Sequence, residues 1–324
     1  MKNLTLIAAV AFIALAFTAC KKEPGVDNTY SIPNGVLLTS FYSNQLSSNT
    51  QTFVVDATDG GTVTAANGMT VTIAPASLYY NQTTVVTGNV TVTLVEVYDR
   101  GRMATMNKAT MGYVPGFVPN DTLAMLISGG EYYLNIAQNG TNVLAPNGVA
   151  VTLPADNTGG TLPGMSQFDG VAVGDDLNWA VNLLGTVQTV TDIDGNEHYL
   201  IMDKIWGWTN VAQFHASGGP YEMVRASMPT GFTPSNCELF ISYDGQGMNL
   251  ASLDGLSGTY FTETYLHVPI GQPVHFIALA YIDGELYYAV QESVIEEDHI
   301  ETIPIAEFHA TTRAQVETII NDLP

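Results

Sequence analysis

The chain has 324 residues, and its 31 Asp and Glu against nine Lys and Arg give a formal net charge of −22. This acidity excludes nucleic acid as an expected partner, because affinity for DNA or RNA depends largely on cations that replace condensed counterions. Hydrophobic residues make up 46% of the chain, which is enough for a sizeable core. The length exceeds the roughly 100 residues of one β-sandwich, so we expect two domains.

The first residues predict a signal peptide over 1–19. Lys2 supplies a positive start, and the apolar run 4–17 is too short to span a bilayer. The segment FTAC, residues 17–20, resembles a bacterial lipobox, in which the cysteine accepts diacylglycerol before cleavage. The resemblance implies that Cys20 is the lipid anchor of the mature protein. The alternative is an ordinary secretory cleavage beside an incidental cysteine.

Residues 20–35 are expected to form a polar tether that keeps the folded body off the membrane. In the lipoproteins that this start resembles, a Lys followed by acidic residues is associated with display on the outer surface. Here only Glu23 follows Lys21 and Lys22. Surface display and attachment facing the periplasm therefore both remain open for an outer-membrane lipoprotein of the cell envelope.

A series of short strand-like runs separated by turn residues predicts a first β-sandwich over 36–154. Strand-like runs separated by Gly, Asn, Asp and Pro lie in VLLTSFYSN, FVVDA, TVTIA, VTVTLVEVY, LAMLI, EYYLNIA and VAVTLP. Asn67-Gly68 sits between two alternating runs and favours a hairpin with a tight primed turn. In VTVTLVEVY the apolar positions change face at Leu94, which predicts a bulge or a switch of sheets there.

The segment GGTVTAANGMTVTIAPASL, Gly60–Leu78, resembles the opening of the β-sandwich domain shared by ankyrins, netrin receptors and zonula-occludens proteins. That opening has a paired-Gly turn and a strand ending in Ile-Pro-x-x-Ala/Leu, whereas here Ala74 precedes Pro75. The likeness implies a β-sandwich scaffold for the first half only. More broadly, the lipoprotein start with EVYDRGRM, LAMLISGGEYYL and IWGW resembles uncharacterised surface lipoproteins of the Bacteroidetes kind, which implies no particular activity.

Residues 155–178 combine Gly, Pro, Asn and Asp without sustained periodicity and are expected to be a linker. Strand patterns resume over 179–308 and predict a second sandwich, in which Asp283-Gly284 marks the clearest hairpin. Residues 309–324 are expected to contain a short helix with a Thr312 capping box and one apolar stripe. The predicted fold class is thus all-β, with two tandem antiparallel immunoglobulin-like β-sandwiches and a C-terminal helix.

The sequence contains few patterns typical of catalytic or metal-binding sites. The six histidines show no H-x-x-x-H, and Cys237 lies in an apolar strand pattern that favours a buried, inert thiol. The segment DIDGNE, 192–197, resembles the first half of a calcium loop, but its far end falls in a strand, so a plain hairpin turn is favoured. We expect no catalytic residue, no metal and no cofactor.

Two tyrosines are the candidate ligand-binding residues. Strand parity places Tyr133 beside Glu131 and Asn135, and Tyr287 beside Glu285 and Gln291, on outward faces. Exposed rings of this kind can stack on sugars while their hydroxyls form hydrogen bonds. The alternative is that they only cover the sheet through cross-strand pairing.

A second aromatic pair, Trp206 and Trp208, is expected to share one strand face around Gly207, where core packing is favoured over a sugar platform. Together the patterns favour a lipid-anchored binding, adhesion or structural protein that contacts the membrane through its lipid and a glycan or envelope protein through its fold. The alternative is an envelope hydrolase acting on glycan or peptide, with scattered acids brought together by the fold.

Overall fold

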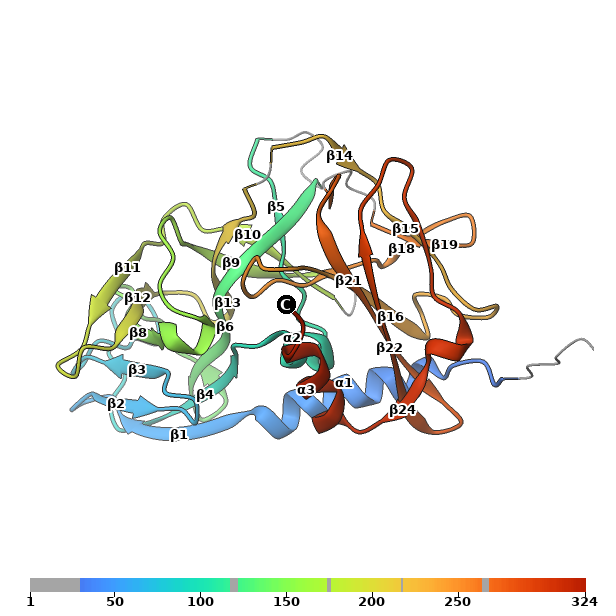
Figure 1. Ribbon diagram of the computed structural model, residues 1–324. Coiled ribbons are helices and arrows are strands. Elements are labelled where there is room, and N and C mark those ends of the chain that lie inside the picture. Colours follow the sequence, from blue (N-terminus) through green and yellow to red (C-terminus); the bar gives the residue numbers. More distant parts are fainter. Residues whose placement is uncertain (1–29, 117–121, 174–175, 217, 264–267) are drawn as a thin grey trace, which may run out of the picture. The chain divides into compact units, whose positions relative to one another are not determined.

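The computed structural model describes residues 30–116, 122–173, 176–216, 218–263 and 268–324. The chain separates into residues 1–31 and a compact unit, Ile32–Pro324. Figure 1 labels the helices and strands of the second unit. The proposed anchor Cys20 lies outside the described residues.

The first half of the unit contains two sheets. The larger one, called the first sheet, has eight strands in the order β1-β4-β6-β13-β9-β10-β5, with β7 paired to β6. Its strands are β1 (Gln51–Asp56), β4 (Asn89–Val97), β5 (Met111–Tyr113), β6 (Leu123–Gln138), β7 (Thr141–Asn142), β9 (Ser166–Val173), β10 (Asp176–Val181) and β13 (Gly207–Phe214). The second sheet has the order β11 (Val187–Thr191), β12 (Glu197–Asp203), β8 (Val149–Pro154), β3 (Thr70–Ile73) and β2 (Gly61–Thr64).

The core of this half is built by alternation along the strands. Val92 and Leu94 of β4, Tyr132 of β6, Val71 of β3 and Val151 of β8 all lose contact with water and belong to one apolar cluster. The cluster draws on both sheets, so each sheet buries one of its faces there. Short 3₁₀ turns follow at Ala155–Thr158 and, near the end of the chain, at Ile305–Glu307.

The second half contains the remaining sheets. A third sheet has the order β17 (Ala251–Ser252), β16 (Cys237–Tyr243), β21 (Pro273–Ile282), β22 (Glu285–Val294) and β24 (His309–Thr311). A four-stranded sheet runs β18 (Gly255–Ser257), β19 (Tyr260–Thr262), β15 (Arg225–Ser227) and β23 (Ile300–Thr302), and β14 (Tyr221–Glu222) pairs with β20 (Val268–Pro269). The described residues are therefore mostly β, as expected.

Three helices fill the space between the first and third sheets. They are α1 (Gly35–Asn49), α2 (Arg100–Met106) and α3 (Arg313–Asn321), and they lie close together in Figure 1. One buried cluster joins Phe41 of α1, Val97 of β4, Met103 of α2, Leu279 of β21 and Ile320 of α3. Because this helical layer shares its core with sheets from both halves, residues 36–154 and 179–308 do not form two separately packed cores.

The expected linker over 155–178 is wrong. Strand β9 and the first half of β10 lie in it. The strands β6, β13, β9, β10 and β5 form a closed ring, because β5 pairs with β6 and also, through the parallel pair Trp179↔Gly112, with β10. Trp179 is fully buried inside this ring with Phe168 and Leu126. Strands β9 and β10 contribute few buried side chains, so their sequences carry little apolar periodicity and resemble a loop.

The expected strand at VLLTSFYSN is also wrong, since these residues lie in α1. Asn34 caps the helix by accepting a hydrogen bond from the backbone N–H of Leu37 at 3.1 Å. Leu38 and Phe41, one turn apart, are the two residues of α1 that are fully buried. A strand would have turned these two side chains to opposite faces, whereas the helix directs both at the same core.

The apolar positions of β4 change face at Leu94, as expected, but neither a bulge nor a switch of sheets causes the change. Pairing of β4 with β6 continues without a register shift from Thr91 to Val97. Val95 and Val97 are buried because the helical layer covers the face opposite the sheet-to-sheet core. The register shift in this region lies between β6 and β13, at Gly129 and Gly130, where Gly130 has a φ of 127°.

The capping box of α3 is confirmed: Thr312 and Gln315 exchange both hydrogen bonds. The Asp283-Gly284 hairpin is confirmed as well, and both turn residues have positive φ. The hairpin at Asn67-Gly68 exists, but its connection runs from residue 65 to 69 and is therefore longer than a primed two-residue turn. The buried carboxylate of Glu96 holds this connection by accepting from the backbone N–H groups of Asn67 and Met69.

Trp206 and Trp208 do not share a face. Trp206 packs against the sheet-to-sheet core, whereas Trp208 packs against the helical layer and the strand ring. Gly207, with a φ of 143°, interrupts the alternation between them. Both indoles serve apolar packing in this arrangement.

Candidate functional site

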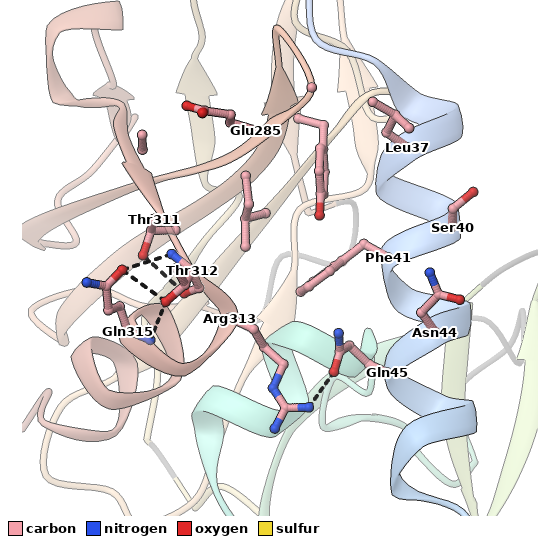
Figure 2. A pocket seen from close by; sticks show the side chains of 14 residues that line it. Leu37, Ser40, Phe41, Asn44, Gln45, Glu285, Thr311, Thr312, Arg313 and Gln315 are labelled. Atoms are coloured by element: carbon pink, nitrogen blue, oxygen red, sulfur yellow. Dashed lines mark hydrogen bonds between the residues drawn. The ribbon is translucent and has the colours of Figure 1, made fainter.

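An open groove lies between α1, the β21–β22 turn and the start of α3. Its cavity volume is about 720 Å³. Figure 2 shows part of its walls, with Phe41 on α1, Glu285 on β22 and Arg313 at the start of α3. The full set of lining residues comprises Leu37, Ser40, Phe41, Asn44 and Gln45 of α1, Tyr281, Gly284, Glu285 and Leu286 of the β21–β22 hairpin, and Ala310, Thr311, Thr312, Arg313 and Gln315 of β24 and the start of α3. Volumes of roughly 300–1,000 Å³ are typical of small-molecule sites.

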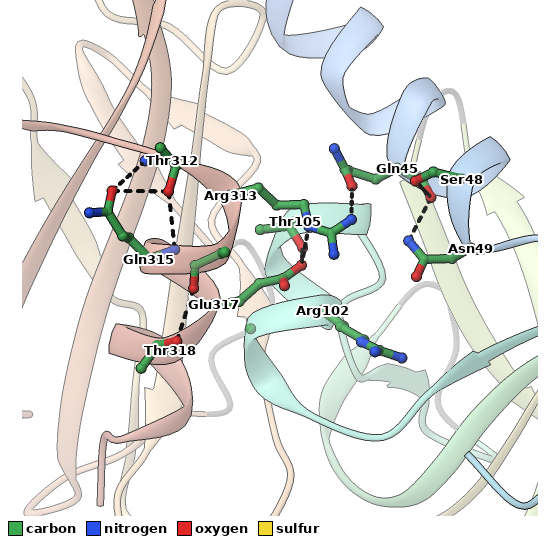
Figure 3. A network of polar contacts seen from close by, with 12 residues as sticks. Gln45, Ser48, Asn49, Arg102, Thr105, Thr312, Arg313, Gln315, Glu317 and Thr318 are labelled. Carbon is green, nitrogen blue, oxygen red and sulfur yellow. Dashed lines mark hydrogen bonds and ion pairs between the residues drawn. The ribbon is translucent and has the colours of Figure 1, made fainter. Parts of the chain in front are cut away.

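Arg313 is held at the base of this groove by two helices. Its Nη1 donates to Gln45 Oε1 of α1 at 2.6 Å, and its Nε lies 3.3 Å from Glu317 Oε1, one turn further along α3. Figure 3 shows these contacts meeting between the helices. The Arg313 side chain keeps 37% of its surface exposed, and among the described residues Nη2 has no partner. A fixed guanidinium therefore offers free N–H donors toward the groove.

Close packing of α2 on α3 fixes the acid that holds Arg313. Thr105 Oγ1 of α2 donates to Glu317 Oε1 at 2.7 Å. Gly101 allows the approach, since a Cβ there would lie 2.6 Å from the backbone oxygen of Glu317. The Gly101 N–H also donates to Asn321 Oδ1 at 2.7 Å. The arginine thus rests on a rigid support.

The floor of the groove is apolar and its rim is polar. The rings of Phe41 and Tyr281 pack with centroids 5.9 Å apart, and Leu286 is buried beside them. Asn44 and Ser40 stand exposed on α1, and Glu285 stands exposed on the opposite rim. Amide and hydroxyl groups both donate and accept hydrogen bonds, so the rim suits a ligand with many hydroxyl or amide groups.

The charges of the groove nearly cancel. Arg313 is its only cationic lining residue among those described, and Glu317 neutralises it at contact distance. Glu285 adds one negative charge at the rim within a strongly acidic protein. An anionic ligand would meet net repulsion, so the arrangement favours an uncharged polar ligand.

The two candidate tyrosines lie in different sheets and are not brought together. Tyr133, on β6, is half-buried against the helical layer and forms an edge-to-face contact with Trp208 at 5.7 Å. Tyr287, on β22, is half-buried and pairs with Ala280 and Ala310. Neither ring lines the groove. The expected outward position of Tyr133 is wrong because helices cover that face of the sheet, and the binding role of both tyrosines stays a prediction.

A serine, a histidine and an aspartate meet elsewhere, on β16 and β21. His275 Nδ1 lies 2.8 Å from Asp244 Oδ1, and Ser242 stands opposite His275 in the strand register. Ser242 is fully buried, however, and its hydroxyl accepts a hydrogen bond from Arg100 Nη1 at 2.9 Å. A nucleophile needs access to substrate, so Ser242 with Arg100 and His275 with Asp244 are better explained as two structural polar pairs than as a catalytic triad.

Other sequence candidates have local structural roles. Asp192 accepts hydrogen bonds from the side chain and the backbone N–H of Asn196, contacts the His198 ring and accepts from the backbone N–H of Asp194, and these contacts lower its pKa. The segment is a hairpin turn between β11 and β12. Cys237 is buried, and burial raises the pKa of its thiol well above the usual range. No group of three or more His, Cys, Asp and Glu arranged for a metal occurs among the described residues.

Comparison with known proteins gives no match: neither a protein-family model nor a curated protein sequence is similar to this chain. Within the part of the chain that the structure describes, no helix has the length and apolar character needed to cross a membrane.

Proposed function

We propose that this protein is a lipid-anchored binding protein of the cell envelope, with β-sandwich architecture, and that its groove binds uncharged glycan chains. The observation that carries the proposal is the guanidinium of Arg313, fixed between Gln45 and Glu317 at the base of an open groove. The free donors of such a group suit sugar hydroxyls, which are good acceptors and also donate to amide and carboxylate oxygens at the rim.

The shape of the groove supports a chain rather than a small buried molecule. Its walls come from a helix on one side and a hairpin turn on the other, and it is open to solvent between them (Figure 2). The apolar floor at Phe41 and Tyr281 provides a surface for a sugar ring, whose carbon-bound faces are themselves apolar. We therefore favour recognition of internal sugar units of a polymer.

Binding is favoured over hydrolysis by the acids available. Glycoside hydrolysis uses two carboxyl groups that flank the scissile bond, about 5–9.5 Å apart. Among the lining residues, Glu285 is the only acid, and nearby Glu317 is occupied by Arg313 and Thr105. The groove thus supplies recognition groups without an evident acid pair.

A matched pair of arginine variants tests the glycan site. Neutral glucans and mannans, with polygalacturonate as the anionic comparison, are screened against the wild type by calorimetry. We expect a neutral polymer to bind, and Arg313→Gln to weaken that binding at least tenfold because the fixed donors are lost. Arg102→Gln serves as the control, since Arg102 pairs with Asp99 and does not line the groove.

Stability is checked on the same variants. A half-exposed ion pair contributes about 0–1 kcal/mol, so Arg313→Gln should unfold within a few degrees of the wild type. Unchanged glycan affinity in folded Arg313→Gln, or preference for the anionic polymer, would contradict the proposed site.

The proposed anchor has its own test. In Cys20→Ala no thiol is available for acylation, and the protein is expected to leave the membrane fraction and become soluble. Several buried acyl chains hold a lipoprotein because each buried CH₂ contributes about 0.8 kcal/mol. Cell fractionation measures the result, and a variant that stays with membranes as the wild type does would refute the anchor.

A further inference from the structure

A second cavity lies against a different face of α1 from the groove. Its volume is about 410 Å³, and its walls come from α1, the end of α2, strands β9 and β10, and the region leading into β16. Leu38, Leu46, Met106 and Val173 give it an apolar lining. The size falls within the range of about 300–1,000 Å³ that is usual for small-molecule sites.

Lys108 supplies a cation to this cavity. Its Nζ donates to the backbone oxygen of Asn107 at 3.1 Å and lies 5.3 Å from the centre of the Trp208 ring. An ammonium group has three N–H donors, and among the described residues one of them is used in the hydrogen bond to Asn107. Burial lowers the pKa of Lys108, and the charges of Glu131 and Asp176 oppose that shift. The ammonium is thus incompletely compensated by hydrogen bonds.

Tyr42, from α1, brings a hydroxyl without a partner. Its oxygen is buried, and no group among the described residues forms a hydrogen bond with it. Burial raises the pKa of Tyr42 well above its usual range, and the charges of Glu238 and Asp176 add to the effect. A neutral phenol in a cavity wall is a group that a ligand can satisfy, and leaving it without a partner is destabilising.

Two carboxylates make the other side of the cavity negative. Asp176 Oδ1 accepts from Asn107 Nδ2 at 2.9 Å, and Glu238 lies in the wall at the start of β16. Asp176 lines the same cavity as Lys108 and Tyr42, and its charge acts on the pKa of both. The cavity therefore presents a positive and a negative pole close together, beside apolar side chains.

We propose that this cavity binds a small zwitterion with an apolar side chain, the chemistry of a free α-amino acid. The ligand carboxylate lies at Lys108, where the unused ammonium donors need an acceptor. The ligand ammonium lies at Asp176 and Glu238 and donates to the Tyr42 oxygen. Its side chain occupies the space lined by Leu38, Leu46 and Met106. This site is separate from the proposed glycan groove and does not depend on it.

The test uses three probes of the same carbon skeleton on the purified full chain. Calorimetry compares L-leucine with 3-methylbutylamine, which lacks the carboxylate, and with 4-methylpentanoate, which lacks the amine. We expect saturable binding of leucine and at least tenfold weaker binding of both analogues. No saturable binding of leucine, or equal binding of either analogue, would overturn the proposal.

Variants assign the binding to the cavity. Lys108→Met and Tyr42→Phe are expected to weaken leucine binding at least tenfold. Tyr42→Phe removes a buried hydroxyl that has no partner, so this variant should unfold at the wild-type temperature or above it. Lys204→Met changes a lysine outside the cavity, and Arg313→Gln changes the groove, so both should bind leucine as the wild type does. Unchanged leucine affinity in folded Tyr42→Phe and Lys108→Met would reject this assignment.

Discussion

Replacement of Trp179 by alanine is expected to lower the free energy of unfolding by about 3–5 kcal/mol. The indole is fully buried at the centre of the strand ring, in contact with the cluster of Phe168 and Leu177. Its Nε1 donates to the backbone oxygen of Ala109 at 2.7 Å. The substitution leaves a cavity and also an unpaired carbonyl, so two costs add. Chemical denaturation followed by fluorescence and circular dichroism measures the loss.

A second substitution separates these two costs. Trp179→Phe keeps most of the apolar volume and removes the hydrogen bond, so its cost should be clearly smaller than that of Trp179→Ala. If β9 and β10 did not enclose Trp179 in a buried cluster, both variants would unfold as the wild type does. The comparison therefore also tests the ring itself.

Arg100→Met is expected to cost about 2–4 kcal/mol, because hydrogen bonds from a charged donor contribute about 1.5–3 kcal/mol each and the apolar replacement relieves part of the desolvation cost. Arg100 is buried and donates to the Ser242 hydroxyl and to the backbone oxygens of Leu323 and Pro324. It thereby ties α2 to the third sheet and to the residues that follow α3.

Arg102→Met is the matched control two residues away. Arg102 is half-exposed and pairs with Asp99 at 3.6 Å, an arrangement worth about 0–1 kcal/mol. Denaturant titration of both variants should show a large loss for Arg100→Met and a small one for Arg102→Met. Equal losses would mean that the buried network contributes little to holding the helices in place.

Local features of the fold were predictable from the sequence where one short pattern determines them. The Asp283-Gly284 turn requires positive φ at two positions, and the Thr312 capping box needs only two side chains three residues apart. The helix at Gly35–Asn49 was missed because its apolar residues do not form a single stripe: Val36 and Leu37 are exposed while Leu38 and Phe41 are buried. Asn34 at the cap, followed by Leu38 and Phe41 one turn apart, was the signal available for it.

Long-range features were not predictable in the same way. Periodicity along β4 shows that both faces are apolar, but it cannot tell whether a sheet or a helical layer covers the second face. The separation into two domains failed for this reason. Likewise, Gln45 and Arg313 are 268 positions apart, and no local sequence pattern predicts the hydrogen bond between them.

The candidate site shows the same limit. Tyr133 and Tyr287 were chosen by strand parity, which gives the face of a strand but not what packs on it. The groove is formed by a helix, a turn and a helix start from distant parts of the chain. Among its residues only the turn at Gly284 and the cap at Thr312 were anticipated, and both were recognised as structural signals.

Hydrogen–deuterium exchange with and without a bound neutral glycan tests the proposed groove most directly. The account predicts slower exchange confined to α1 around Leu37–Gln45, the β21–β22 turn around Gly284–Leu286, and Ala310–Gln315. These segments supply the groove walls. Protection on β6 around Tyr133 or on β22 beyond the turn, with no change in α1 and at the start of α3, would place the ligand elsewhere and contradict the account.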